Sequence, residues 1–205
     1  MPAEALHTAS GLLVQGPLLI TPRVFADDRG FFYESWNERR FRSELIDGGV
    51  PATEAEAVVF RQDNHSRSSR GVLRGLHYQL PPEPQGKLVR CSVGAIFDVA
   101  VDLRRGSPSY GQWVGAELSA ENHQQLWVPV GFAHGFLTLS ELAEMQYKAS
   151  GFWNRDCERS LRWDDPSLAI AWPLDQVGVP EPLLAPKDGE APLLAALETS
   201  SEVFP

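Results

Sequence analysis

Short apolar or alternating segments recur along most of the chain, and turn signals separate them. The segments include LLVQGPLLITPRVF, KLVRCSV, AIFDVAVDL, QQLWVPV and AHGFLTLS, and the turn signals include Asp28-Arg29-Gly30, Gly94 and Gly131. Many short strands at a spacing of roughly 8–12 residues are typical of a β-sandwich or barrel. The pattern therefore predicts an all-β fold, an antiparallel sandwich or barrel built mainly from residues 12–172.

Two segments depart from the strand pattern and predict short helices. Asn37 can cap the segment ERRFRSELID, which would place Phe41, Leu45 and Ile46 on one helical face. A second helix is expected at APLLAALE near the end of the chain. The proline-rich stretch 173–192 has no clear period, so we expect residues 173–205 to form an extended tail over the body. No repeat or second domain is visible, and residues 1–205 are expected to form a single domain.

The composition permits a packed core, with 43% hydrophobic and 22% charged residues. No apolar run reaches about 18 residues, so we expect no membrane-spanning helix. The first residues lack a basic region followed by an apolar one, so we expect no secretion signal. The two cysteines exclude a disulfide scaffold and favour a reducing cytoplasm.

The net charge of −9 argues against binding to nucleic acid or to an anionic membrane. Residues 61–90 differ from the rest, because they contain six basic side chains against only two acidic ones. This local excess fits either a solvated polar face of a strand or an anion site for a small phosphorylated ligand.

Two partial motifs of metal-binding cupin barrels are present. Gly71, His77 and Glu83 fit the pattern G-x5-H-x-H-x3-E, but Gln79 stands at the second histidine position. PVGFAH fits P-x-G-x2-H and ends in His134. The chain thus resembles a cupin with a broken ligand set, and we expect no metal, because glutamine is a poor ligand for transition metals. A metal-dependent cupin oxygenase or isomerase stays an alternative, as does a purely structural role for each histidine.

The remaining chemistry favours proton transfer. No serine or cysteine lies in a nucleophile-elbow pattern, no glycine-rich phosphate loop is present, and Cys91 and Cys157 are expected to be structural. A neutral imidazole is a natural general base near pH 7, and it works best when a carboxylate fixes its tautomer. We therefore expect acid–base chemistry without a cofactor or a covalent nucleophile.

Longer segments carry a resemblance to a known family. In order they include RVFADDRGFFYESWN, QDNHSRS, GVLRGLHYQ, QGKLVRC, YKAS, WDDPSLAIAWP and APKDGEAPLL. They are similar to the dTDP-4-dehydrorhamnose 3,5-epimerase family from about Pro17 to Leu194. The resemblance implies a cupin-type jelly-roll fold and inversion of C3 and C5 of dTDP-4-dehydro-6-deoxy-D-glucose, giving dTDP-4-dehydro-L-rhamnose. It also implies a homodimer with exchanged N-terminal strands.

The resemblance further implies roles for individual residues. His77 would be the base, and Asp165 would be the acid that hydrogen-bonds this base. Lys87 would stabilise the enolate, and Tyr147 would be the acid on the opposite face of the sugar. The nucleotide sugar would be bound by Lys87 and by Arg29, Glu34, Gln62, Asn64, Arg74, His134, Glu158 and Lys187. These groups suit a 4-keto sugar, whose hydrogens at C3 and C5 are acidified by the C4 carbonyl, and arginine suits its pyrophosphate.

Two related functions stay open. One is a single-site 3-epimerase or ketoisomerase for another 4-keto-6-deoxysugar nucleotide, although Tyr147 favours the double epimerase because C5 needs its proton. The other is a non-catalytic sugar-binding cupin. The presence of both an acid and a base argues against it, because binding alone needs neither.

Pro84, Phe152 and Trp153 differ from residues common in the family, so the nucleotide preference is left open.

Overall fold

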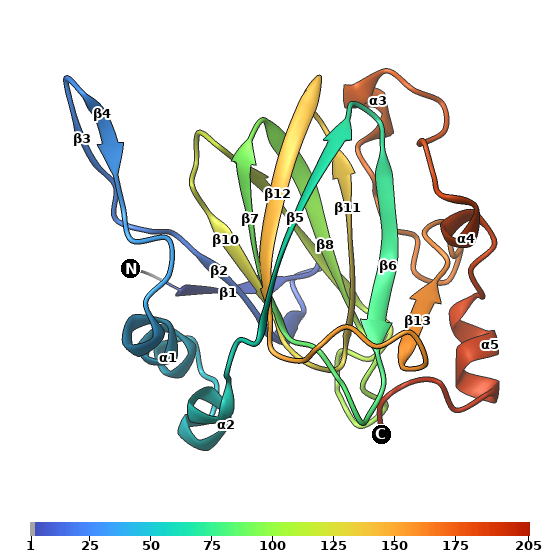
Figure 1. Cartoon of the computed structure of the whole chain (residues 1–205). Helices are drawn as coiled ribbons and strands as arrows, with labels where there is room; N and C mark the ends of the chain where they lie inside the picture. The colour runs from blue at the N-terminus through green and yellow to red at the C-terminus, as the bar shows by residue number, and fades with distance from the viewer. Residues whose placement is uncertain (1–2) are drawn as a thin grey trace.

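The fold is a sandwich of two antiparallel sheets, shown by a computed structural model that describes residues 3–205 (Figure 1). The larger sheet has the strand order β1 (Ala3–His7), β2 (Leu13–Ile20), β10 (Gln125–Val128), β7 (Lys87–Val93), β12 (Leu142–Ala149) and β5 (Gln62–Ser69). The smaller sheet has the order β13 (Glu158–Leu161), β6 (Leu73–Gln79), β11 (Phe132–Thr138), β8 (Ala95–Asp102) and β9 (Trp113–Ser119). The predicted all-β antiparallel sandwich is confirmed.

Alternation along the larger sheet decides which side chains enter the interior. In β7, Val89 and Cys91 lie in an apolar cluster between the sheets, and buried Lys87 shares their side of the strand. In β12, Met145 belongs to the same cluster and Tyr147 packs against it. A cation and a phenol are therefore held at the edge of an apolar core.

The first predicted helix is present as α1 (Glu38–Asp47), on the outer side of the larger sheet. The side chain of Asn37 accepts hydrogen bonds from two backbone N–H groups of the first turn, at 3.1 and 3.3 Å. Phe41 and Leu45 are buried against the sheet, whereas Ile46 is exposed, contrary to expectation.

A short helix that the sequence did not predict follows as α2 (Ala52–Ala57). A separate ribbon of β3 (Phe25–Asp27) and β4 (Gly30–Phe32) stands away from the sandwich (Figure 1). No helix among residues 3–205 is long and apolar enough to cross a membrane. Both cysteines are buried as free thiols.

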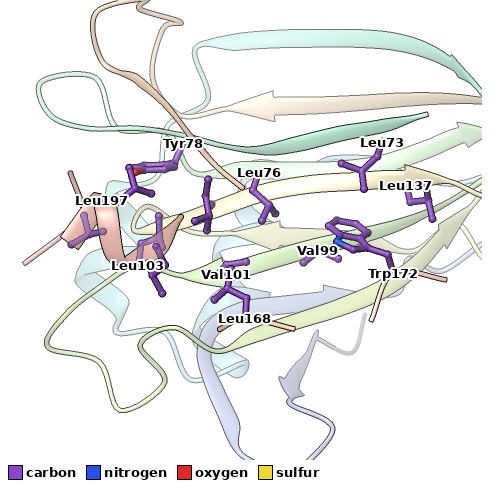
Figure 2. Packing of buried hydrophobic residues seen from close by; sticks show 14 of the residues in the cluster. Leu73, Leu76, Tyr78, Val99, Val101, Leu103, Leu137, Leu168, Trp172 and Leu197 are labelled. Carbon is purple, nitrogen blue, oxygen red and sulfur yellow. The ribbon is translucent and has the colours of Figure 1, made fainter. Parts of the chain in front are cut away.

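The C-terminal part of the chain covers one face of the smaller sheet and belongs to the core. Figure 2 shows Leu168 and Trp172 beside Val101 and Val99 of β8, and Leu197 near Leu103 in the same cluster. Three helices lie in the segment that was expected to be extended, namely α3 (Leu174–Val177), α4 (Pro186–Gly189) and α5 (Leu194–Thr199). The last of these, α5, overlaps the segment APLLAALE, where a helix was predicted. The other two are single turns of four residues, which are too short for a helical period to show in the sequence.

Candidate active site

A cavity of about 580 Å³ lies among β5, β6, β7, β11, β12 and residues 183–188 of the C-terminal segment. Its wall combines strands of both sheets with a piece of chain that is more than a hundred residues distant from β5 and β6. Of the residues proposed for the site, those that line this cavity are Asn64, Arg74, His77, Lys87, His134, Tyr147 and Lys187. The fold thus gathers side chains that are scattered in the sequence.

His77 on β6 faces a buried carboxylate from α4. Its Nε2 lies 2.6 Å from Oδ1 of Asp188, whose Oδ2 accepts a hydrogen bond from the Gly75 amide at 3.1 Å. Burial by itself would raise the pKa of Asp188, but the hydrogen bonds from His77 and Gly75 outweigh it and hold that pKa below its usual range. Because an ionised carboxylate only accepts hydrogen bonds, Nε2 carries the proton and Nδ1 is the basic nitrogen.

Asp165 does not contact His77, so the hydrogen bond predicted between them is wrong. Its carboxylate is buried and accepts hydrogen bonds from the amide and hydroxyl of Ser167 at 2.8 and 2.6 Å. It also accepts one from the amide of Leu194 at 2.6 Å. Asp165 is therefore engaged in local and C-terminal contacts, and the carboxylate partner of His77 comes from α4 instead.

Asp188 was missed because it lies in the segment interpreted as an extended tail. The available signal was the segment APKDGEAPLL, which belongs to the family resemblance and contains this aspartate beside Lys187. Sequence patterns do not show that the segment folds back onto β6.

Lys87 and Tyr147 lie on the larger sheet, across the cavity from His77. Burial lowers the pKa of Lys87 to about 8, while the charges of Asp98 and Glu158 oppose this effect. The Lys87 Nζ donates to the carbonyl oxygen of His77 at 3.2 Å and lies 5.8 Å from the centre of the Tyr147 ring. Burial also raises the pKa of Tyr147, so its phenol keeps its proton at neutral pH.

His134 on β11 forms a second imidazole–carboxylate pair in the same cavity. It is the register partner of His77, and its Nε2 lies 2.8 Å from Oδ1 of fully buried Asp98. Burial lowers the pKa of His134 despite the neighbouring carboxylate, so the ring is neutral at neutral pH. Sequence reasoning missed Asp98, although an aspartate in the middle of the apolar run AIFDVAV was a usable signal.

An imidazole–carboxylate pair on one sheet and a lysine and a phenol on the other sheet face a single cavity, and three of these side chains, His77, Lys87 and Tyr147, are residues to which the family resemblance implies catalytic roles. The sequence profile of the dTDP-4-dehydrorhamnose 3,5-epimerase family matches residues 12–196. The chain belongs to this family. The family assignment agrees with the sandwich fold, since solved structures of members superpose on it.

Curated members of the dTDP-4-dehydrorhamnose 3,5-epimerase family are close in sequence. The protein from Pseudomonas aeruginosa is 54% identical over 187 residues, covering 91% of this chain and 96% of the relative. The protein from Salmonella typhimurium is 53% identical over 177 residues, covering 86% and 90%. The Mycobacterium tuberculosis epimerase structure matches with a TM-score of 0.86 and 36% identity, covering 100% of this chain and 94% of that one. The Legionella pneumophila enzyme, solved with dTDP-4-keto-L-rhamnose, matches with a TM-score of 0.82 and 43% identity, covering 97% and 96%.

The remaining predicted binding residues occupy the edge of the epimerase-family cavity or lie apart from it. Glu158 pairs with cavity-lining Lys187 at 3.3 Å, and Gln62 donates to cavity-lining Asn64 at 2.9 Å. Lys187 and Arg74 add positive charge to this part of the site. An anionic diphosphate would be attracted to such a rim.

Arg29 and Glu34 do not line the cavity of their own chain. Arg29 sits at the tip of the β3–β4 ribbon, where its side chain is 90% exposed and pairs with Asp27. Glu34 pairs with Arg40 of α1 at 2.8 Å. Within residues 3–205, therefore, these two predicted binding residues stand apart from the other members of the set.

Gln79 takes part in local structure. Its amide nitrogen donates to the carbonyl oxygens of Glu83 and Phe152, and its oxygen accepts from the amide of Asn154. It thereby ties the loop after β12 to the end of β6. No group of three or more His, Cys, Asp or Glu in the described chain is placed to hold a metal ion.

Proposed function

We propose that this chain performs its 3,5-epimerase reaction with His77 as the base and Tyr147 as the acid on the opposite face. The activity is that of the family, and its substrate is dTDP-4-dehydro-6-deoxy-D-glucose. The observation that supports the residue roles best is the position of these two groups on different sheets of the sandwich, β6 and β12, around one cavity.

The base would act on hydrogens next to the C4 carbonyl. His77 Nδ1 removes a proton from C3 or C5, and the electron pair left on that carbon delocalises onto the C4 oxygen to give an enolate. The ionised Asp188 stabilises the imidazolium that forms. The Lys87 ammonium faces the cavity and stabilises the enolate oxygen, an effect that is often the largest in such reactions.

Inversion at C5 requires that the proton return from the other face of the ring. The Tyr147 phenol retains its proton and lies on the sheet opposite His77, so it supplies this proton, and the collapse of the enolate regenerates the C4 carbonyl. The basic side chains Arg74 and Lys187 at the cavity bind the diphosphate, with His134 as a neutral hydrogen-bonding group.

The active assembly would be a homodimer with exchanged N-terminal strands. The β3–β4 ribbon exposes Phe25, Phe31 and Phe32 to 53%, 61% and 69%, which is unfavourable for an isolated two-stranded ribbon in water. Packing of this ribbon against a second copy would bury the rings and bring Arg29 and Glu34 to the neighbour's cavity. The edge strand β1 supports the same proposal, since unpaired edges favour association.

A single-site epimerase is the second candidate. A 3'-monoepimerase from Streptomyces bikiniensis, solved with dTDP-quinovose, matches with a TM-score of 0.81 and 33% identity. The 54% identity to a curated 3,5-epimerase and the match to that family's profile favour inversion at both carbons.

Incubation with dTDP-4-keto-6-deoxyglucose in deuterated water distinguishes the two candidates. We expect NMR to show deuterium at both C3 and C5 of the product. Deuterium at C3 alone would contradict double epimerisation and support the monoepimerase.

A further inference from the structure

The carboxylate partner of the base is carried by a segment that is anchored at both ends. Residues 183–194 include α4 and form part of the cavity wall. At the first end, the Leu183 amide donates to the carbonyl oxygen of Gly71 at 2.8 Å, and the Leu73 amide donates to that of Leu183 at 3.0 Å. These bonds fix the start of the segment beside β6.

The second end is held by residues 162–165, which follow β13. The Arg162 amide donates to the carbonyl oxygen of Pro192 at 2.9 Å, and its Nε donates to that of Ala191 at 2.7 Å. The Leu194 amide donates to Asp165 Oδ2 at 2.6 Å. Three hydrogen bonds therefore fasten residues 191–194, a few residues after Asp188.

Asp165 is the charged member of this second anchor. Burial by itself would raise the pKa of the Asp165 carboxyl. The hydrogen bonds from Ser167 and Leu194 outweigh burial and lower this pKa, so the carboxylate is ionised. Leu193, the N-cap residue of α5, makes no side-chain capping bond within residues 3–205. Asp165 thus provides, from another part of the chain, the acceptor for the first amide of α5.

The single turn between the two anchors has little stability of its own. α4 spans four residues, and a helix this short depends on tertiary contacts. The fit of Asp188 against β6 is also close, because a Cβ added at Gly75 would lie 2.8 Å from the Asp188 Cγ. A small displacement of α4 would therefore break the hydrogen bond to His77.

We propose that Asp165 is a positioning residue that acts through Leu194 and the C-terminal segment to hold Asp188 against His77. The proposal rests on the roles proposed above for His77 and Asp188. It assigns to Asp165 an indirect effect on the base that it was first expected to contact.

The test compares Asp165→Asn with Asp164→Asn in the full chain. Asparagine at 165 can keep the Ser167 hydrogen bonds with its oxygen, but its NH₂ then faces the Leu194 amide, so two donors meet. Asp164 is half exposed and forms a long ion pair with Arg162 at 3.8 Å, so Asp164→Asn removes the same charge from the adjacent position as a matched control. We expect Asp165→Asn to lower kcat by about 10–100-fold with little change in KM, and Asp164→Asn to retain the wild-type kcat.

A spectroscopic readout separates positioning from loss of stability. The proton between His77 Nε2 and Asp188 should give a downfield NMR resonance in the wild type and in Asp164→Asn, and this resonance should shift upfield or broaden in Asp165→Asn. Arg162→Gln removes the bond to Ala191 from a part-exposed side chain and should act in the same direction with a smaller effect. If Asp165→Asn does not fold, the kcat and the downfield resonance of Arg162→Gln still test the positioning role.

The outcomes distinguish this inference from the proposed roles of the pair. If Asp188→Asn lowers kcat and removes the resonance while Asp165→Asn and Arg162→Gln lower only the melting temperature, the positioning role is wrong. If Asp188→Asn itself leaves kcat unchanged, the proposed role of the His77–Asp188 pair fails first.

Discussion

Two imidazole–carboxylate pairs lie side by side in one cavity and differ in their burial. The His134 side chain is 5% exposed and faces an aspartate of the neighbouring strand β8, whereas the His77 side chain is 24% exposed and faces an aspartate of the C-terminal segment. Burial keeps His134 neutral, which suits a hydrogen-bonding group. If His77 is the base and His134 a binding residue, as proposed above, the two rings differ in their access to the cavity and not in having a carboxylate partner.

The largest expected effect comes from removing the more exposed ring. His77→Ala should lower kcat by about 10²–10⁴-fold, because the base is lost, while dTDP binding measured by calorimetry should persist through the basic side chains. His134→Ala should lower kcat less and weaken substrate binding more. A larger loss of kcat in His134→Ala than in His77→Ala would reverse the assignment of the two rings.

The lysine between the two pairs predicts an alkaline limit on activity. In the proposed reaction the ammonium form of Lys87 stabilises the enolate, and burial lowers its pKa to about 8, so kcat/KM should fall as the pH rises through that value. At a pH below the pKa of Lys87, its side chain is an ammonium ion and its stabilisation of the enolate is fully present. A pH–rate profile checks this prediction, and a profile that stays flat from pH 7 to about 9.5 would contradict the role of Lys87.

A smaller effect is expected at the carboxylate of the buried pair. Asp98→Asn keeps an oxygen acceptor for His134 but removes a charge that raises the pKa of Lys87. We therefore expect only a modest loss of kcat at pH 7 and a shift of the alkaline limb to lower pH. A shift to higher pH would show that Asp98 does not support the charge of Lys87.

The sequence predicted those parts of the fold whose cause is local. Strand alternation identified the sandwich, and the capping side chain of Asn37 marked the start of α1 to the residue. The single turns α3 and α4 were not predictable in this way, because each contains only one helical turn and its stability comes from distant contacts.

The two aspartates show the same limit at the site. Asp165 and Asp188 both lie in segments that resemble the family, and both are buried and hydrogen-bonded. Which of them meets His77 depends on how the C-terminal segment crosses β6, and no spacing in the sequence encodes that path. His77, Lys87 and Tyr147 were proposed from segments of the family resemblance, and each lies on a strand that lines the cavity.

The central claim is that proton removal and proton return occur on opposite sheets of the sandwich. Tyr147→Phe tests it directly, because it keeps the ring and most of its packing while removing the proton donor. The measurement is deuterium incorporation at C3 and C5 by NMR in deuterated water, with wild type as the control. We expect exchange at C3 to continue through His77 while inversion at C5 falls sharply. Equal slowing at both carbons, or no slowing at either, would contradict the account.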